Sequence, residues 1–212
     1  MSETERSEVM NGKFFDLKKE KQDRMINAAL KVFAGRGYRH ASTDDIVREA
    51  AISKGLLFHY FQSKLGVYHF IYDYSVRYMS LELKSFVNSK ETDLFEVLKQ
   101  VEYARMHAMR SYPYMQQFLN RSMAEDCCEA LESIEEKRGS LQETYDGIYA
   151  QIDYSSIPRG VDGDKLQKML DFTVKGLLAE RFQEASFQPE MLYGEICEYL
   201  DMMKEIVYRN RE

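Results

Sequence analysis

The stretch that most constrains the fold is residues 43–61, TDDIVREAAISKGLLFHYF, in which two short helical patterns are separated by a tight break. Thr43 and Ser53 stand at the start of the two patterns, and both are residue types that cap helix N-termini. The apolar residues that recur at helical spacing are Ile46, Val47 and Ala50 in the first pattern and Leu57, Phe58 and Phe61 in the second. Two short helices joined by about three residues indicate a helix-turn-helix.

The composition favours a helix-rich globular protein. The 212 residues include only 3 prolines and 11 glycines, and 44% of them are hydrophobic and 30% charged. No apolar run approaches the ~18 residues of a membrane-spanning helix, and residues 1–12 lack the basic and apolar parts of a signal peptide. The odd set Cys127, Cys128 and Cys197 indicates no disulfide framework. Together these features predict a cytoplasmic protein.

The net charge of −6 is unevenly distributed along the chain. Residues 1–67 carry 12 Lys and Arg against 9 Asp and Glu, whereas residues 68–212 carry 17 against 26. A basic N-terminal part on an acidic remainder fits a DNA-binding surface confined to one end of the chain. Because the excess in the first part is mild, the charge alone favours DNA binding only slightly.

The rest of the chain predicts further helices and no strand, so we expect an all-α fold. We expect residues 1–17 to form a mobile N-terminal extension, residues 18–63 a helix-turn-helix head and residues 64–212 a larger helical body. Within the extension, the apolar side chains of Phe14, Phe15 and Leu17 can pack back onto the first helix. The expected helices cover residues 18–36 (ended by Gly35 and Gly37), 43–50, 54–61, 64–87, 93–109, 114–137, 164–184 and 189–209. Residues 141–152 are either a separate helix or a continuation of the preceding one, and residues 153–163 form the clearest loop.

The last two expected helices form a pair with wide apolar faces, so one side can meet the chain's own core and the other a second copy. Two such helices from each of two chains make a four-helix bundle across a two-fold axis. The alternative is that the whole face is intramolecular core. The residues predicted for the dimer interface are Val174, Leu177, Leu178, Arg181, Phe182, Leu192, Ile196, Tyr199, Leu200 and Met203.

Residues 26–64, INAALKVFAGRGYRHASTDDIVREAAISKGLLFHYFQSK, resemble the N-terminal part of the tetracycline-repressor (TetR) family of one-component transcriptional regulators. The most specific residues are Ser53-Lys54-Gly55, Tyr60-Phe61 and Ser63-Lys64, together with the start at Thr43. The other helices agree with the family only in number and rough length. The resemblance implies a regulator, by default a repressor, that binds a palindromic operator in double-stranded DNA as a homodimer and is released by an effector.

The resemblance also implies which residues contact DNA. Gly55 begins the second helix of the motif, where a missing side chain lets the backbone approach the DNA closely. Lys54 can reach a phosphate or a guanine edge. The hydroxyl groups placed to donate to phosphates are those of Thr43, Ser53 and Tyr60.

Further candidate contacts come from residues around the second helix. Lys64 starts the next helix, where the cation and the helix N-terminus both favour phosphate. His59 is a candidate base or phosphate contact if the apolar side chains of its helix face inward, and a solvated surface histidine otherwise. Leu56 and Phe58 depart from the small or polar residue and the tyrosine common in the family, and Leu56 can touch a thymine methyl group. Ala51 replaces the usual turn glycine, at a cost of about 1 kcal/mol if its backbone is left-handed.

An effector pocket in the body is a further implication of the resemblance. With 12 Met and 15 Tyr, the chain has adaptable apolar side chains and phenol hydroxyls suited to a small hydrophobic effector. The acidic body favours a cationic or neutral effector over an anionic one, and ordinary core packing is the alternative for each residue. The candidate lining residues are Tyr72, Met79, Tyr103, Met106, Phe118, Met123 and Tyr145.

Two other function classes fit the sequence less well. The four histidines show no metal-ligand spacing, and no glycine-rich phosphate loop or nucleophile elbow is present, so we expect neither an enzyme nor a cofactor. A helical adaptor that binds only protein explains the body but leaves the basic head without a role.

Overall fold

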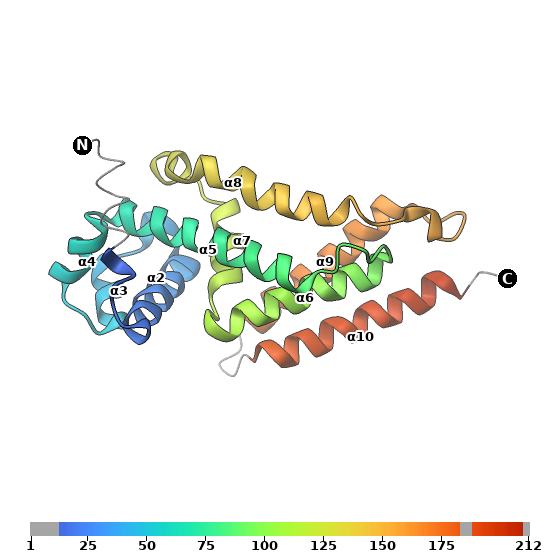
Figure 1. Ribbon diagram of the computed structural model, residues 1–212, viewed down its shortest axis with the longest axis horizontal. Helices are drawn as coiled ribbons and strands as arrows, with labels where there is room; N and C mark the ends of the chain where they lie inside the picture. The colour runs from blue at the N-terminus through green and yellow to red at the C-terminus, as the bar shows by residue number, and fades with distance from the viewer. Residues whose placement is uncertain (1–12, 183–187, 210–212) are drawn as a thin grey trace. The chain divides into compact units, whose positions relative to one another are not determined.

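The computed structural model describes residues 13–182 and 188–209 of the chain. Within these residues it contains nine α-helices, one short 3₁₀-helix and no strand (Figure 1), which confirms the predicted all-α fold. The helices are α2 (Lys19–His40), α3 (Thr43–Ala50), α4 (Lys54–Phe61), α5 (Lys64–Phe86), α6 (Leu94–Ser111), α7 (Met115–Met123), α8 (Cys128–Tyr149), η1 (Tyr154–Ser156), α9 (Gly163–Arg181) and α10 (Pro189–Tyr208). Residues 1–12 of the predicted extension lie outside the described range.

The end of α2 differs from the prediction. Gly35 lies inside the helix rather than ending it, and the helical geometry breaks only at Gly37, whose φ is 68° and ψ 174°. A short helical segment then continues to His40, and the backbone N–H of Ala41 donates to the Gly37 carbonyl at 3.2 Å. Since glycine adopts positive φ without steric penalty, Gly37 is the residue that permits this break.

The predicted single helix over residues 114–137 is wrong, because the structure has two helices there. α7 ends at Met123, and α8 begins at Cys128 and runs through Gly139 without interruption. Glu125 in the connection accepts hydrogen bonds from the backbone N–H groups of Asp126 and Cys127, both at 3.2 Å. These bonds satisfy amides at the start of α8 and stabilise the break.

The helices fall into two compact units. The first unit is Met1–Tyr78 with Ser111–Leu141, and the second is Met79–Arg110 with Gln142–Glu212. In the first unit α2 packs against both α3 and α7. Phe33 of α2 is fully buried there, with ring centroids 5.1 Å from Tyr68 and 6.2 Å from Phe118.

The second unit is organised around the pairing of α9 with α10. Arg181 Nε donates to Glu195 Oε2 at 2.8 Å and links the two helices. Their buried apolar side chains join those of α6 in one core, which comprises Leu94, Phe95, Val97, Leu98, Met109, Ile152, Leu166, Leu170, Val174, Leu177, Leu178, Leu192, Ile196 and Leu200. No helix in the described ranges is long and apolar enough to span a membrane.

Candidate nucleic-acid interface

The helix-turn-helix is formed by α3, α4 and the three residues between them. Ser42, not Thr43 as predicted, caps α3, and its Oγ accepts from the Asp44 N–H at 3.1 Å. Ser53 caps α4 as predicted and accepts from the Leu56 N–H at 3.2 Å. Ala51 lies in the left-handed region, with φ 50° and ψ 52°, so the turn has the backbone for which glycine is the usual residue.

One face of α4 packs inward and the opposite face is open. Leu57 and Phe61 are 1% and 5% exposed, which buries this face in the core of the first unit. Lys54, Gly55 and His59 are exposed, and no neighbouring atom lies within 4 Å of where a Gly55 side chain would begin. The exposed face therefore presents the ammonium group of Lys54, the accessible backbone at Gly55 and the imidazole of His59.

The remaining predicted residues of the motif lie at the edges of this open face. Leu56, Tyr60 and Thr43 are half-buried, and Ser53 is exposed. The ring of Tyr60 lies 4.9 Å from that of His59, in an edge-to-face arrangement. Such a contact orients an aromatic ring while leaving its polar end accessible.

Acidic residues of α3 engage the basic side chains near the motif. Lys54 Nζ forms an ion pair with Asp44 at 2.8 Å, and both side chains are more than half exposed. Arg36 and Arg48 both pair with Asp45. Since exposed ion pairs contribute little to stability, Lys54 can exchange Asp44 for another anion at low cost.

Lys64 has a structural role that the sequence did not indicate. Its Nζ donates to the carbonyl oxygens of Tyr38 and Ala41, at 3.0 and 3.4 Å, and lies 4.4 Å from the centroid of the Tyr38 ring. The ammonium thus neutralises the carbonyl end of α2. Its predicted phosphate contact stays a prediction.

Phe14 of the predicted extension packs against α4. It is fully buried, and its ring centroid lies 5.7 Å from Tyr60, 5.4 Å from Phe61 and 4.9 Å from Phe70. Gln22 Nε2 donates to the carbonyls of Phe15 and Leu17 at 3.0 and 2.7 Å. Phe14 is therefore packed against the motif, and the backbone of Phe15 and Leu17 is bound to α2, whereas the side chain of Phe15 is exposed.

The predicted effector-lining residues divide between the two units. Tyr72 and Phe118 are buried in the first unit with ring centroids 6.3 Å apart, whereas Met123 is 58% exposed. Met123 is exposed because α7 ends there. The residues in the second unit are Met79, Tyr103, Met106 and Tyr145.

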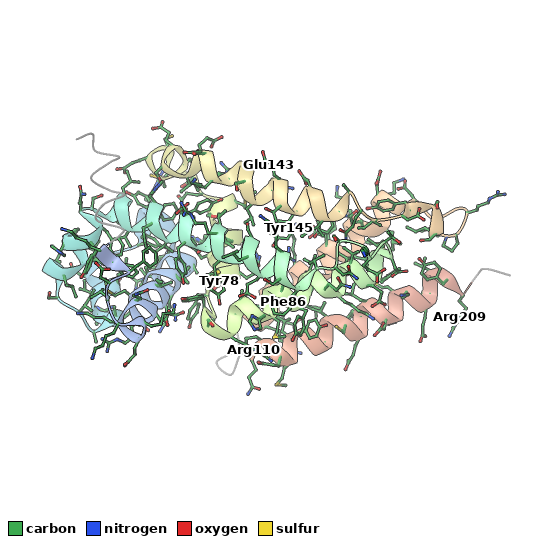
Figure 2. The ribbon with its side chains drawn as sticks, viewed as in Figure 1. Tyr78, Phe86, Arg110, Glu143, Tyr145 and Arg209 are labelled. Carbon is green, nitrogen blue, oxygen red and sulfur yellow. The ribbon has the colours of Figure 1, made fainter. Side chains whose placement is uncertain are left out.

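The four residues of the second unit occupy different surroundings. Met79 and Met106 are buried core residues, and Tyr103 contacts the rings of Phe86 and Tyr193. Tyr145, which lies on α8 (Figure 2), accepts a 3.2 Å hydrogen bond from Arg105 Nε. These positions leave the predicted effector role untested.

Most of the predicted dimer residues are core residues of a single chain. Val174, Leu177, Leu178, Leu192, Ile196 and Leu200 are at most 8% exposed. Arg181, Phe182 and Met203 are half-buried, and Tyr199 is 39% exposed. The buried six pack in the core of the second unit, and their role in a dimer stays a prediction.

Sequence similarity to a known family covers the motif and the residues next to it. Residues 25–69 match the family model described as "Bacterial regulatory proteins, tetR family". A curated relative, the uncharacterized HTH-type transcriptional regulator YuxN of Bacillus subtilis, is 42% identical over 59 residues. That match covers 26% of this chain but only 20% of the relative.

Similarity to solved structures extends over most of the chain. A TetR family transcriptional regulator from Chloroflexus aurantiacus has a TM-score of 0.62 at 22% identity, covering 93% of this chain and 96% of that one. The regulator FadR from Bacillus subtilis, solved in complex with stearoyl-CoA, has a TM-score of 0.56 at 17% identity, covering 84% and 96%. At these identities the similarity establishes a shared fold.

Proposed function

Because the chain belongs to the tetR family of bacterial regulatory proteins, we propose that it is a ligand-responsive transcriptional regulator, by default a repressor. It binds a palindromic operator as a homodimer, and a small hydrophobic effector releases it. Residues 18–63 read the DNA, and residues 64–212 bind the effector and the second protomer. Such a protein works where bacterial DNA is, in the cytoplasm, and has no enzymatic activity.

The observation that carries DNA binding is the open face of α4. A recognition helix must present side chains and close backbone to the major groove while its other face anchors it. Lys54, Gly55 and His59 are exposed on this helix, and Leu57 and Phe61 anchor it. Phe14 packs against Phe61 of this helix and holds it in place, which reduces the conformational entropy that is lost when DNA binds.

Exposed apolar residues on α9 and α10 support the dimer. They are 39–68% exposed, and a group of such residues on one helix pair is typical of a protein–protein contact. These residues, which replace the buried ones as the proposed contact, are Met169, Phe172, Met191, Tyr199, Met202 and Ile206. Facing pairs of helices would form the four-helix bundle.

A hydrophobic effector is supported by the composition of the body and by the structural relative. FadR of Bacillus subtilis, which has the same fold, was solved with stearoyl-CoA, a ligand with a long apolar chain. The tyrosine- and methionine-rich helices of this chain provide apolar surface that can adapt to such a ligand.

A gel-shift titration with the DNA that flanks the chain's own coding region tests the DNA-binding role. We expect binding that weakens steeply with salt, and Lys54→Gln should lower the salt slope by about one per protomer. Lys90→Gln, which removes another exposed lysine, in the loop before α6, is the matched control and should leave the slope unchanged. A dimer that binds no DNA under any condition would instead favour the protein-binding adaptor.

Sedimentation tests the dimer separately. Phe172→Asp places a charge on the proposed contact and should yield monomers, since a buried unpaired charge is costly. Leu81→Asp is the control, because Leu81 on α5 is similarly exposed, at 64% against 60% for Phe172. A Phe172→Asp protein that remains dimeric would move the interface elsewhere.

A further inference from the structure

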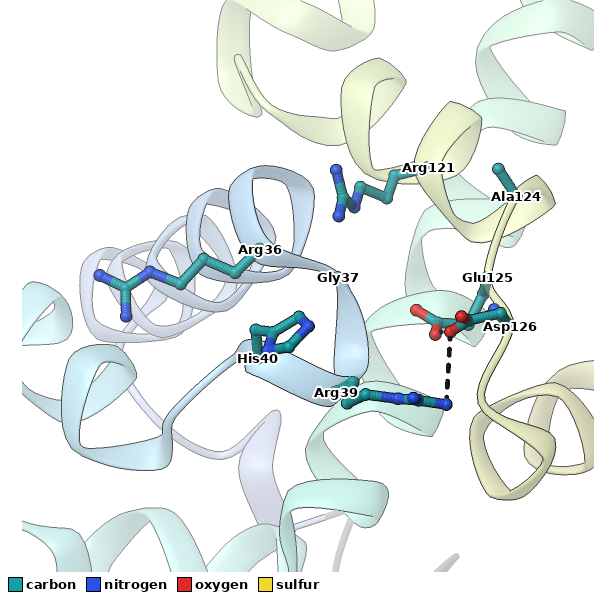
Figure 3. A pocket seen from close by; sticks show the side chains of 8 residues that line it. All are labelled: Arg36, Gly37, Arg39, His40, Arg121, Ala124, Glu125 and Asp126. Carbon is teal, nitrogen blue, oxygen red and sulfur yellow. Dashed lines mark hydrogen bonds and ion pairs between the residues drawn. The ribbon is translucent and has the colours of Figure 1, made fainter.

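A pocket of about 420 Å³ lies within the first unit, between the end of α2 and the end of α7 (Figure 3). It is separate from the open face of α4 and contains none of the predicted effector-lining residues. Four of its eight lining residues carry arginine or histidine side chains and two carry carboxylates. The residues are Arg36, Gly37, Arg39, His40, Arg121, Ala124, Glu125 and Asp126.

The carboxylate of Glu125 is already committed to neighbouring N–H groups. Its Oε2 accepts from the backbone N–H of Tyr38 at 2.9 Å, and its Oε1 accepts from the N–H groups of Asp126 and Cys127. Three donors therefore offset this negative charge within the protein. Glu125 shapes the pocket wall but does little to repel an anion.

The arginines of the pocket differ in how firmly they are engaged. Arg36 pairs with Asp45 and points away from Gly37 in Figure 3. Arg39 and Asp126 are 3.7 Å apart, with exposed fractions of 60% and 79%. A long, exposed ion pair of this kind contributes little, so Arg39 is available to a stronger anion.

Arg121 is the cation that the pocket leaves unmatched. Its side chain forms no hydrogen bond or ion pair within residues 13–182 and 188–209, and the same holds for His40. The guanidinium lies against Gly37: a Cβ at that position would be 3.1 Å from its Nε and 3.2 Å from its Nη2. The glycine needed for the break in α2 thus also makes room for this guanidinium beside the pocket.

From this arrangement we infer that the pocket binds a phosphate group, held by Arg121, Arg39 and His40. Guanidinium groups donate paired N–H bonds that match the oxygens of phosphate, and the pocket is large enough for a phosphate that carries a further group. The phosphate can come from a free phosphorylated compound or from the DNA backbone. Binding of a DNA phosphate rests on the proposed function, whereas binding of a free phosphorylated compound does not.

Thermal unfolding of the full chain without DNA tests the free compound, with inorganic phosphate and pyrophosphate compared with chloride at equal ionic strength. We expect pyrophosphate to raise the melting temperature in a saturable manner. Arg121→Gln should weaken the apparent affinity roughly tenfold or more, and Arg39→Gln should weaken it as well. Arg77→Gln removes an exposed arginine of α5 from the same unit and should bind as the unchanged protein does.

The DNA source is tested by the salt dependence of operator binding. If the pocket holds a backbone phosphate, Arg121→Gln lowers the slope by about one per protomer and the free anions have little effect. Circular dichroism checks that each variant is folded. If Arg121→Gln does not fold, Arg39→Gln serves as the test of the phosphate site in its place. Saturable anion binding or a changed slope supports the phosphate site. If a folded variant shows neither effect, the proposed phosphate site is overturned. The anion result is independent of DNA binding and stands even if the chain binds no DNA.

Discussion

The hydroxyl of Tyr112 donates a 2.6 Å hydrogen bond to Asp23 Oδ1 and so joins the turn before α7 to α2. Lys19 Nζ donates to the same hydroxyl at 3.0 Å, and the Tyr74 hydroxyl lies 2.6 Å from it. At the other end of α7, the Tyr38 N–H donates to Glu125. Hydrogen bonds near both ends of α7 thus hold α2 in place, so the DNA-reading motif is built onto a wider frame than residues 18–63.

Tyr112→Phe should lower the free energy of unfolding by about 1–2 kcal/mol, because it removes a buried donor to a carboxylate. Tyr114→Phe is the matched control. Its hydroxyl has no hydrogen bond in the described structure, and the change should stay within about 0.5 kcal/mol. Urea denaturation measures both, and equal effects would contradict the assigned role of Tyr112.

Gly66→Ala should be strongly destabilising. A Cβ at Gly66 would lie 1.9 Å from the carbonyl oxygen of Phe61, so the end of α4 or the start of α5 must shift. We expect a loss of about 2–3 kcal/mol. Gly139→Ala in α8 has no atom within 4 Å of the new side chain and should gain about 0.5–1 kcal/mol from helix propensity. A neutral Gly66→Ala would show that α4 and α5 approach less closely.

Ala51→Gly should stabilise the motif. Ala51 holds a left-handed backbone that costs an L-residue roughly 1 kcal/mol, and glycine removes this cost while losing more chain entropy on folding. The net gain should be at most about 1 kcal/mol. Ala50→Gly, one residue earlier in helical backbone and fully buried, should instead lose about 1 kcal/mol. Thermal denaturation of the two variants would reveal opposite signs.

The pKa of Tyr38 is raised to about 12, first by burial and then by the hydrogen bond that its hydroxyl donates to Glu129. The folded state therefore favours the protonated phenol. The resulting stability is complete below an unfolded pKa of about 10 and is lost as the pH rises through 12. Between pH 8 and pH 11 the wild type should lose about 1 kcal/mol more than Tyr38→Phe. Urea titrations at the two pH values test this, and parallel losses would contradict it.

How far the sequence predicts the structure depends on whether a signal is local. The sequence predicts Ser53 as a cap because both partners of its hydrogen bond lie within one helical turn. The position of Lys64 over the α2 carbonyls joins residues 26 apart in the chain, and periodicity carries no information about such a contact.

The dimer residues illustrate a second limit. Helical spacing shows that α9 and α10 have wide apolar faces, but it does not divide each face between core and surface. Val174 is buried and Phe172 exposed only because of how the two helices pack together. The sequence does not predict the buried pair of Glu102 and Arg105 for a related reason, since a charged residue on a helix is usually solvated.

That pair yields the last prediction. The Glu102 side chain is 4% exposed and forms an ion pair with Arg105, whose guanidinium lies 5.0 Å from the centroid of the Tyr145 ring. Burial raises the pKa of Glu102, while the guanidinium opposes that rise, so the carboxylate depends on Arg105 for its charged form. Arg105→Met alone should cost about 3 kcal/mol, because it leaves a buried acid without its partner.

Replacing both residues separates pairing from packing. The double variant Glu102→Met with Arg105→Met removes both charges and keeps the volume, so its stability should return to within about 1 kcal/mol of the wild type. Denaturant unfolding of the single and double variants forms a mutant cycle that isolates the interaction. If the two losses simply add, the charges do not depend on each other, and the Arg105–Tyr145 contact rather than the ion pair stabilises this part of the second unit.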